Sequence, residues 1–444
     1  MIELVLAADD FITLKAELIG GDTEKCAVLY ANQMIRADGV VRLLVRESQF
    51  PAAADYTKKE LLEAELKPEF VARVTKRARR DACAVVFVHS HPGSEAPRFS
   101  HIDLNGEKHL ATFLATRHPA LTHASVVISA AGIRARRLGG GEDIRVISIG
   151  TEREVLFDPL SPSSMISEKF DRQLRAFGSD GQKALQCLRI AIVGLGGTGS
   201  LIAQQLVHLG VRNFILIDPD ILESTNLNRV ANATPDDIGK PKIEIAAQYI
   251  HAIAQDANVA CINGDVIQAR TARELLNADL IFGCTDSHGS RAVLQQISYQ
   301  YMIPCIDMGV TITVKNGIIT HIYGRVQLLS PGLACFTCGG LLNPNEVRHD
   351  MMTAFERQAD PYIQGEREPA PAVMSLNSTA ASLAITMMLA IVTKVPMGAR
   401  HVLYNAMSSS LRAVRGQPQP NCYICSRSGS LARGNTWPLF AREA

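Results

Sequence analysis

Two histidines stand one residue apart directly after a short apolar run, as His89-Ser90-His91 following Val85–Val88. Side chains alternate along a β-strand, so both imidazoles are expected on one side, where they can share a metal ion. Asp103 follows where a helix is predicted to begin, and its carboxylate would add an oxygen ligand. Three such ligands make an open zinc site of the catalytic kind, with one position left for water. In the alternative interpretation, the histidines are incidental and Asp103 only caps the helix.

Hydrolysis at such a site also requires a general base and a donor for the developing oxyanion. Glu24 is the predicted base, and Ser100 is the second catalytic candidate. Glu47 is a further candidate for the base, although a solvated charge at the end of a strand is its plainer interpretation.

Four of the ten cysteines form two Cys-x-x-Cys pairs, Cys335 with Cys338 and Cys422 with Cys425. This spacing is typical of zinc sites, and four thiolates make a closed tetrahedral site with a structural role. The alternative is four cysteines without a ligand. Ten cysteines in 444 residues are too few for a disulfide scaffold, which favours a reducing compartment. We therefore predict a cytoplasmic location.

A glycine-rich segment, 194–199, lies between a predicted strand and a predicted helix. Glycines there permit a tight turn and let a phosphate approach the backbone amides at the helix start. Asp218, at the end of the next strand, can hold a ribose hydroxyl. Taken alone, these features match a dinucleotide-binding fingerprint and favour a nicotinamide or flavin enzyme. The glycines expected at the nucleotide are Gly194, Gly196, Gly197 and Gly199.

Polar residues after this segment favour a different reaction. Asn226, Arg229 and Lys242 would surround the phosphates of a nucleoside triphosphate with amide and cationic groups. Hydride transfer needs no such cluster, whereas cationic groups suit adenylyl transfer, in which a carboxylate attacks the α-phosphate of ATP and pyrophosphate leaves. Asp286 is predicted at the carboxyl end of a strand, where it can hold Mg²⁺. ATP and Mg²⁺ are therefore predicted at this site.

The elements that would position these residues divide the chain into two predicted domains. Residues 1–155 alternate apolar runs with helical stretches, one of them at 58–80, and predict a mixed α/β domain. Residues 156–166 contain two prolines among serines and predict a linker. Residues 167–426 follow a strand, helix, strand pattern that predicts an α/β domain with a Rossmann-like, doubly wound sheet. Residues 427–444 have no strong periodicity and are predicted to be a tail.

Composition excludes several classes of protein. With 47% hydrophobic and 20% charged residues, the chain can bury a core. A formal charge of +1 gives no overall attraction to nucleic acid. The longest apolar run, 380–392, falls short of the roughly 20 residues of a membrane span and predicts a buried helix. No signal-peptide pattern follows Met1. Neither nucleic acid nor a membrane is therefore a predicted partner.

The first 150 or so residues resemble the JAB/MPN family of JAMM metalloproteases. This resemblance implies that the two histidines and the aspartate bind a catalytic zinc ion. It also implies that Glu24, just before a strand that contains cysteine, is the general base. The activity implied is cleavage of a peptide or isopeptide bond after a ubiquitin-like tail. The residues that carry the resemblance are His89, His91, Pro92, Ser100 and Asp103.

Residues 167–426 resemble the ThiF/MoeB family of ubiquitin-like-protein activators, which also includes the adenylation halves of ubiquitin-activating enzymes. By this resemblance, Arg229 and Lys242 stabilise the phosphates of ATP, and the four cysteines hold a structural zinc ion. Arg172 matches an arginine that reaches the site of the neighbouring subunit, which implies a homodimer. The residues implied in ATP binding are Gly194, Gly196, Gly197, Asp218 and Asn226.

The sequence departs from this second family in the segment before the late apolar helix. Members that pass the activated tail to sulfur usually have a nucleophilic cysteine there, but 366–375 contains none. We therefore expect the acyl adenylate to pass directly to an outside acceptor, either a sulfur donor or a conjugating partner. Ser375 is an alternative nucleophile that would form an oxyester. Val230, where relatives often have glutamine, is a further departure.

Together, these features predict that one chain trims a ubiquitin-like protein and then adenylates the exposed tail, in a prokaryotic ubiquitin-like modification system. Activation of a sulfur-carrier protein for cofactor synthesis is an alternative. A scaffold that binds a ubiquitin-like protein without turnover is a second alternative. A nicotinamide dehydrogenase is a third, and Arg229, Lys242 and Asp286 disfavour it.

Overall fold

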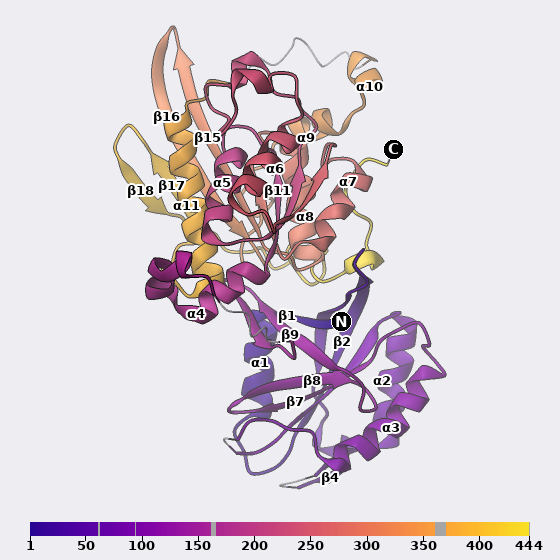
Figure 1. The fold of residues 1–444 in the computed structure, drawn as a ribbon. Helices are drawn as coiled ribbons and strands as arrows, with labels where there is room; N and C mark the ends of the chain where they lie inside the picture. The colour runs from indigo at the N-terminus through magenta and orange to yellow at the C-terminus, as the bar shows by residue number, and fades with distance from the viewer. Residues whose placement is uncertain (61–62, 94, 161–165, 360–369, 444) are drawn as a thin grey trace. The chain divides into compact units, whose positions relative to one another are not determined.

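The computed structural model describes residues 1–60, 63–93, 95–160, 166–359 and 370–443. These residues form two compact units, which Figure 1 shows with their helices and strands labelled. Unit 1 contains the described residues up to 162 together with 300–302 and 427–438. Unit 2 contains the other described residues.

Eight of the described strands form the sheet of unit 1, in the order β1-β3-β2-β6-β7-β8-β9-β10. β1 also pairs with β9, so the sheet closes on itself. Both of its faces are buried, because β2 directs Leu29 into one apolar core and Val28 and Tyr30 into another. The strands are β1 (Ile2–Ala7), β2 (Cys26–Ile35), β3 (Val41–Gln49), β6 (Ala84–Ser90), β7 (Ala124–Ser129), β8 (Gly132–Arg137), β9 (Asp143–Ile149) and β10 (Arg153–Phe157).

Helices cover both faces of this sheet. α1 (Ala8–Leu18) packs on one face, and α2 (Pro68–Arg80) and α3 (His101–Ala115) pack on the other. Figure 1 shows α1 on one side of the strands and α2 with α3 on the opposite side. Phe87 of β6 belongs to the core beneath α2 and α3, so strand alternation places His89 on the same face.

The helix predicted over 58–80 is wrong in its first part. Tyr56–Lys59 (β4) and Ala64–Leu66 (β5) pair as a short antiparallel hairpin, and α2 begins only at Pro68. Proline suits the first turn of a helix because the backbone N–H that it lacks would have no partner within the helix.

Eight of the described strands form the sheet of unit 2, in the order β13-β12-β11-β14-β15-β16-β17-β18. The first five are parallel, and the last three are antiparallel to their neighbours. The chain order reverses between β11 and β14, which confirms the predicted doubly wound sheet. The strands are β11 (Arg189–Val193), β12 (Asn213–Ile217), β13 (Asn258–Ile262), β14 (Leu280–Gly283), β15 (Cys305–Lys315), β16 (Ile318–Leu329), β17 (His401–Asn405) and β18 (Ser410–Ala413).

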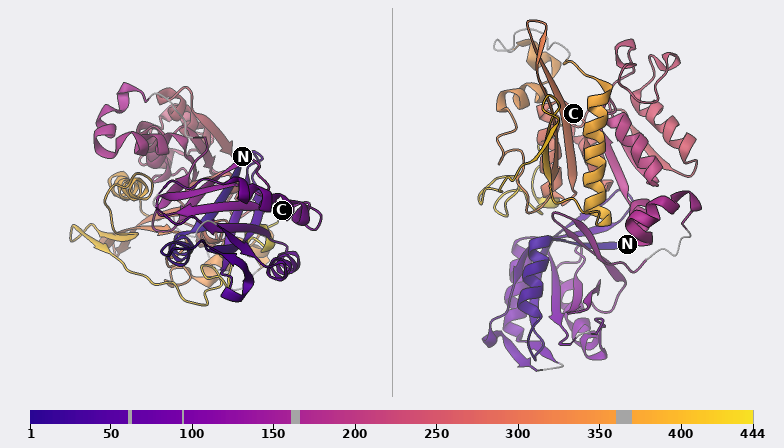
Figure 2. Two further views of the ribbon diagram at one scale, coloured as in Figure 1. Left: turned by 90° about the horizontal axis from the view of Figure 1, so that it is seen from below. Right: turned by 90° about the vertical axis from the view of Figure 1, so that its left-hand side faces the viewer.

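The helices of unit 2 connect and cover these strands. The right-hand view of Figure 2 shows α11 running along β15 and β16, and it packs on both. Half of its residues are buried, which confirms the buried helix predicted at 380–392. Of the described helices, α11 alone is long and apolar enough to cross a membrane. The helices are α4 (Asp171–Cys187), α5 (Gly199–Leu209), α6 (Lys242–Ile253), α7 (Ala269–Glu274), α8 (His288–Gln300), α9 (Pro344–Met351), α10 (Ala354–Ala359) and α11 (Met374–Thr393).

The division of the chain differs from the prediction at two places. The linker predicted at 156–166 begins too early because β10 pairs with β9 as far as Phe157, and 161–165 lie outside the described residues. The predicted tail is folded: residues 427–438 pack in unit 1, and 439–443 belong to unit 2. Its backbone groups find partners in each unit, which explains why it does not extend into solvent.

One buried contact anchors the end of the chain in unit 1. Asn32 Nδ2 on β2 donates a hydrogen bond of 2.9 Å to the carbonyl oxygen of Ala432. We expect Asn32→Ala to lower the stability of unit 1 by about 1–3 kcal/mol, because the buried carbonyl would lose its partner. Calorimetric unfolding would measure this loss.

Asn258→Ala is the matched control, since Asn258 is exposed on β13. Equal unfolding temperatures for the two variants would contradict the anchoring role of Asn32.

Candidate functional site

Three side chains of unit 1 meet at the carboxyl end of β6. His89 Nε2 lies 3.4 Å from Asp103 Oδ1, and His91 Nε2 lies 4.0 Å from Asp103 Oδ2. Donor atoms that are each about 2.1 Å from a tetrahedral zinc ion lie about 3.4 Å apart, so this spacing suits one ion. His89 Nε2 is buried without a hydrogen-bond partner among the described residues, as expected for a metal ligand. The structure thus brings the three predicted ligands together.

Backbone contacts fix the strand end that carries the two histidines. β6 lies between β2 and β7 in the sheet, and His91 N donates to Ile128 O at 2.9 Å. On the other side, Lys25 N donates to Ser90 Oγ at 3.0 Å. Both imidazoles are therefore attached to a rigid part of the sheet.

Ser100 places the third ligand by capping α3. Ser100 N donates to Asp103 Oδ2 at 2.6 Å, and Asp103 N donates to Ser100 Oγ at 3.2 Å, which is a capping box. Burial alone would raise the pKa of Asp103, but His89 and the hydrogen bonds with Ser100 hold this pKa well below its usual range. Asp103 is therefore ionised, the form that binds a metal. The predicted catalytic role of Ser100 stays a prediction beside this observed one.

Glu24 lies beside the histidines in the loop before β2. Its Oε1 is 3.6 Å from His91 Nε2, and its side chain is buried. Burial raises the pKa of Glu24 to about 7; the nearby His89 opposes this rise, and the Asp103 carboxylate adds to it. A pKa near neutrality suits a general base. The alternative base, Glu47, instead forms an ion pair of 2.5 Å with Arg77.

A cavity of about 810 Å³ adjoins this cluster within unit 1. It lies against α2, α3, β5 and β6, and Glu24, His89 and Asp103 form part of its wall. Such a volume accommodates a ligand of several residues, with apolar walls for contact and a few polar groups for orientation. Its apolar lining includes Leu66, Pro68, Val71, Phe87, Leu110 and Phe113.

The two Cys-x-x-Cys pairs of unit 2 meet in space as predicted. Cys335 Sγ lies 3.5 Å from Cys422 Sγ, and Cys338 Sγ lies 3.4 Å from Cys425 Sγ. Thiolates at about 2.3 Å from a tetrahedral zinc ion lie about 3.8 Å apart, so the four sulfurs fit one ion. Hydrogen bonding among the sulfurs, chiefly with Cys425, lowers the pKa of Cys335. Gln419 N also donates to Cys338 Sγ at 3.2 Å.

A side chain at Gly194 or at Gly199 of loop 194–199 would collide with backbone atoms. A Cβ at Gly194 would lie 2.7 Å from Cys284 O, and one at Gly199 would lie 1.8 Å from Gly194 O. Gly194 also has φ of +89°, which favours glycine. At Gly196 a Cβ would meet open space. The loop therefore turns tightly from β11 into α5 and leaves its outer side free for a ligand.

Two residues predicted to contact the nucleotide brace the polypeptide around this loop. Asp218 accepts hydrogen bonds from Leu195 N at 2.5 Å and from Asp220 N at 2.8 Å. Burial raises the pKa of Asp218, while these two backbone donors act in the opposite direction. Asn226 is buried, and its Oδ1 accepts from Glu223 N at 3.2 Å. Their contacts with ATP remain predictions.

The two predicted cationic residues lie next to the loop. Lys242 Nζ, at the start of α6, forms an ion pair of 2.7 Å with Asp220 Oδ2. Arg229 Nη1 donates to Thr225 O at 2.7 Å, and a Cβ at Gly197 would lie 3.4 Å from Arg229 Cδ. Both cations are thus held near the place where phosphates would bind.

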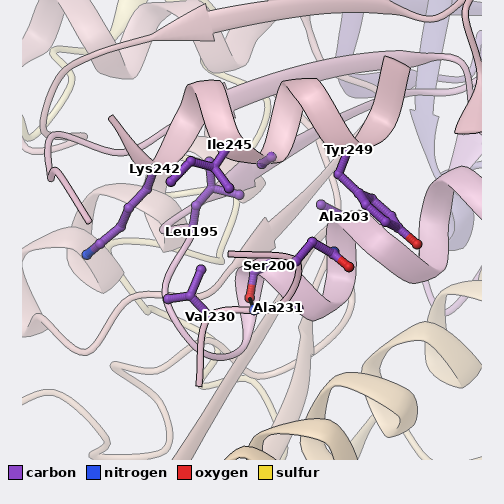
Figure 3. Close-up of a pocket in the computed structure, with 10 residues that line it drawn as sticks. Leu195, Ser200, Ala203, Val230, Ala231, Lys242, Ile245 and Tyr249 are labelled. Carbon is purple, nitrogen blue, oxygen red and sulfur yellow. Dashed lines mark hydrogen bonds between the residues drawn. The ribbon is translucent and has the colours of Figure 1, made fainter. Parts of the chain in front are cut away.

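A small pocket of about 10 Å³ lies behind the loop, between α5 and α6 (Figure 3). It holds at most one water molecule and is no space for a nucleotide. Ser200 Oγ, which lines it, accepts a hydrogen bond of 2.9 Å from Ala231 N. Val230 is buried and supplies apolar lining beside Lys242.

Asp286 and Arg172 are exposed. Asp286 follows β14, so it stands at the carboxyl edge of the sheet, where the strand order reverses. Arg172 lies on α4, and its predicted role across a dimer stays a prediction. Within the crossover segment, 366–369 lie outside the described residues, and Ser375 is exposed at the start of α11.

Sequence reasoning missed an amide at the loop. A Cβ at Gly197 would lie 2.3 Å from Nδ2 of Asn377, a buried residue in the first turn of α11. The available signal was an asparagine near the start of a helix that has no charged residue. Asp220, the partner of Lys242, was also missed, although it stands two residues after Asp218.

Two alanine substitutions in the glycine loop should differ strongly in their effect on the stability of unit 2. We expect Gly199→Ala to destabilise unit 2 by about 3 kcal/mol, because the new Cβ would collide with backbone. Gly196→Ala is the control and should unfold like the wild type, since its Cβ meets open space. Calorimetry that found Gly199→Ala as stable as Gly196→Ala would contradict this geometry.

Family models match both units, and the curated relatives are adenylyltransferases and activating enzymes. The ThiF family matches residues 170–424, and prokaryotic homologs of the JAB domain match 20–139. Molybdopterin-synthase adenylyltransferase of Escherichia coli (strain K12) is 28% identical over 270 residues, 60% of this chain and 99% of that protein. SAMP-activating enzyme E1 of Haloferax volcanii is 24% identical over 254 residues, 57% of this chain and 85% of that protein.

A shorter match is to a third activating enzyme. Ubiquitin-like modifier-activating enzyme 5 of Culex quinquefasciatus is 30% identical over 162 residues, which is 34% of this chain and 39% of that protein. The ThiF match covers more than half of the 444 residues. The chain therefore belongs to the ThiF family, and it carries a JAB-type domain of the prokaryotic kind ahead of the ThiF domain.

Proposed function

We propose that this adenylyltransferase acts on the carboxyl terminus of a ubiquitin-like protein and that its JAB-type domain exposes that terminus by proteolysis. The observation that carries the adenylation half is the convergence of Arg229, Lys242 and Asn377 on the glycine loop at the carboxyl end of β11. The named activities of two relatives, which activate SAMP and a ubiquitin-like modifier, support this substrate class.

In the proposed reaction, the terminal carboxylate attacks the α-phosphate of ATP, and pyrophosphate leaves. The outer side of the glycine loop would bind the phosphates through backbone N–H groups at the start of α5. Arg229 and Lys242 would offset the charge that develops on the leaving pyrophosphate. Asp286 would hold Mg²⁺, which supplies further charge neutralisation when bound. Lys242 must exchange its partner Asp220 for phosphate, since its Nζ is paired at 2.7 Å.

Exchange of labelled pyrophosphate into ATP tests this half. With a ubiquitin-like protein that ends in Gly-Gly, we expect Lys242→Ala to lower the exchange rate about a hundredfold, because a phosphate contact is lost. Lys240→Ala is the matched control: Lys240 pairs with Asp237 at 2.8 Å and should tolerate the change. If the wild type gives no exchange with any such protein, the scaffold alternative replaces this proposal.

The activated tail is proposed to pass directly to an outside acceptor. Burial raises the pKa of Cys26, Cys83, Cys261, Cys284 and Cys305, so none of these five thiols is primed as a nucleophile. Cys187 is exposed at the end of α4, away from the crossover segment in the sequence. The proposed acceptor is a sulfur donor or a conjugating enzyme. Activation of a sulfur-carrier protein is the second candidate function, and the similarity to molybdopterin-synthase adenylyltransferase favours it. Ser375, exposed at the start of α11, is the alternative oxyester site.

The JAB-type domain is proposed to be a zinc peptidase. A zinc ion bound by His89, His91 and Asp103 would supply Lewis-acid activation of water and of the scissile carbonyl. Glu24, whose carboxylate lies 3.6 Å from His91 Nε2, would take the proton of the attacking water and pass it to the leaving amine. The cavity of about 810 Å³ beside these groups would receive the substrate chain around the scissile bond.

Cleavage of a ubiquitin-like protein extended beyond Gly-Gly tests this half. We expect Glu24→Gln to slow cleavage about a thousandfold, because the general base is lost, while the zinc content stays unchanged. Glu47→Gln is the control and should cleave like the wild type, since Glu47 is paired with Arg77. His89→Ala should lose one of two zinc ions, measured by atomic absorption. Loss of cleavage in Glu47→Gln but not in Glu24→Gln would contradict the assignment of the base.

Two further features complete the proposal. The enzyme would be a cytoplasmic homodimer in which Arg172, exposed on α4, reaches the site of the partner subunit. Trimming would precede adenylation, since only the trimmed terminus presents the carboxylate that attacks ATP.

A further inference from the structure

A buried carboxylate in unit 2 binds two arginines. Asp307 lies on β15, opposite Gly283 of β14, and its side chain is 1% exposed. Its Oδ2 accepts from Arg291 Nε at 3.2 Å, and its Oδ1 accepts from Arg325 Nη2. A buried carboxylate is stable only with such partners, so the three side chains hold one another in a fixed geometry.

Arg291 extends this cluster to the loop that follows β14. From the first turn of α8, its Nη2 donates to Thr285 O at 2.8 Å, and its Nη1 lies 3.4 Å from Asp286 O. One guanidinium therefore joins the buried carboxylate to two successive carbonyl groups. These contacts hold the backbone from which the exposed side chain of Asp286 extends.

The other side of the cluster contacts the four-cysteine site. The Arg325 guanidinium lies 4.9 Å from the ring centre of Phe336, which is fully buried. Gln295, one turn after Arg291 on α8, donates to Thr337 Oγ1 at 3.1 Å and accepts from Thr337 N at 3.3 Å. Phe336 and Thr337 are the two residues between the cysteines of the first Cys-x-x-Cys pair. Side chains with fixed partners thus run from that pair to the loop of Asp286.

We propose that Arg291 is a positioning residue for Asp286. The four-cysteine site in turn holds Arg291 in place through Asp307, Arg325 and α8. The four-cysteine site would then have a role beyond stability, because segment 335–338 would help to position Asp286, the proposed magnesium ligand. This inference rests on the proposed role of Asp286 in adenylation.

Hydrogen–deuterium exchange of the full chain without nucleotide tests the positioning directly. In Arg291→Lys, we expect peptides covering 284–290 to exchange about tenfold faster, because lysine cannot bind the carboxylate and the carbonyls together and a charged hydrogen bond is lost. Cys338→Ser, which disturbs the cysteine site, should speed exchange in the same peptides. Arg270→Lys, exposed on α7, is the matched control and should not change them.

A second readout measures magnesium. Wild-type protein with ATP should show a rise in thermal midpoint as Mg²⁺ is added, and Arg291→Lys should need about tenfold more Mg²⁺ for half of this rise. Asp307→Asn, which keeps the side-chain volume, replaces Arg291→Lys if that variant does not fold, and the same shifts are expected.

Unchanged exchange at 284–290 in folded Arg291→Lys would overturn the positioning role. Unchanged exchange in Cys338→Ser would overturn the contribution of the cysteine site. If exchange changes as expected but ATP and Mg²⁺ never alter the thermal midpoint of the wild type, the positioning stands and the proposed adenylation fails.

Discussion

The nucleotide site depends on one steric constraint, the close approach of Gly199 to the carbonyl oxygen of Gly194. A Cβ at Gly199 would lie 1.8 Å from that oxygen, so α5 can begin directly after the loop only with glycine there. The same turn brings Gly194 against Cys284 O, at the end of β14. A contact between backbone atoms thereby joins the carboxyl ends of two parallel strands. Of the residues proposed to act on ATP, Asp286 follows the end of β14, Lys242 begins α6, and Arg229 lies in a turn between β12 and α6.

Both units place a functional carboxylate by backbone hydrogen bonds, but with different consequences. Asp103 uses Oδ2 to accept from Ser100 N, which leaves Oδ1 directed at His89, so bracing and metal binding are compatible. Asp218 accepts a backbone N–H on each of its two oxygens, so a ribose hydroxyl would share an acceptor already in use. The hydrogen bonds of Asp218 therefore stabilise the glycine loop itself.

The sequence was most informative where a function depends on residues close together in the chain. The parallel sheet of unit 2 followed from continuous apolar runs, because strands covered on both faces need no polar side. His89, His91 and Asp103 could be grouped because a strand end and a helix start constrain them locally. Asn377 at the glycine loop, the cluster around Asp307 and the packing of 427–438 in unit 1 all join residues far apart in the chain. The periodicity of apolar residues does not predict contacts between distant parts of the chain. The β4–β5 hairpin was missed for another reason: its strands are short and lie next to a charged helix in the sequence.

The central claim is that one chain matures a ubiquitin-like protein and then activates the same terminus. The most direct test follows pyrophosphate exchange with two forms of that protein, one ending in Gly-Gly and one extended beyond it, using wild-type enzyme and Glu24→Gln. The account predicts that the wild type supports exchange with both forms, after a lag with the extended one. Glu24→Gln should support exchange only with the form that ends in Gly-Gly. Equal exchange by Glu24→Gln with both forms, or none by the wild type with the extended form, would contradict the account.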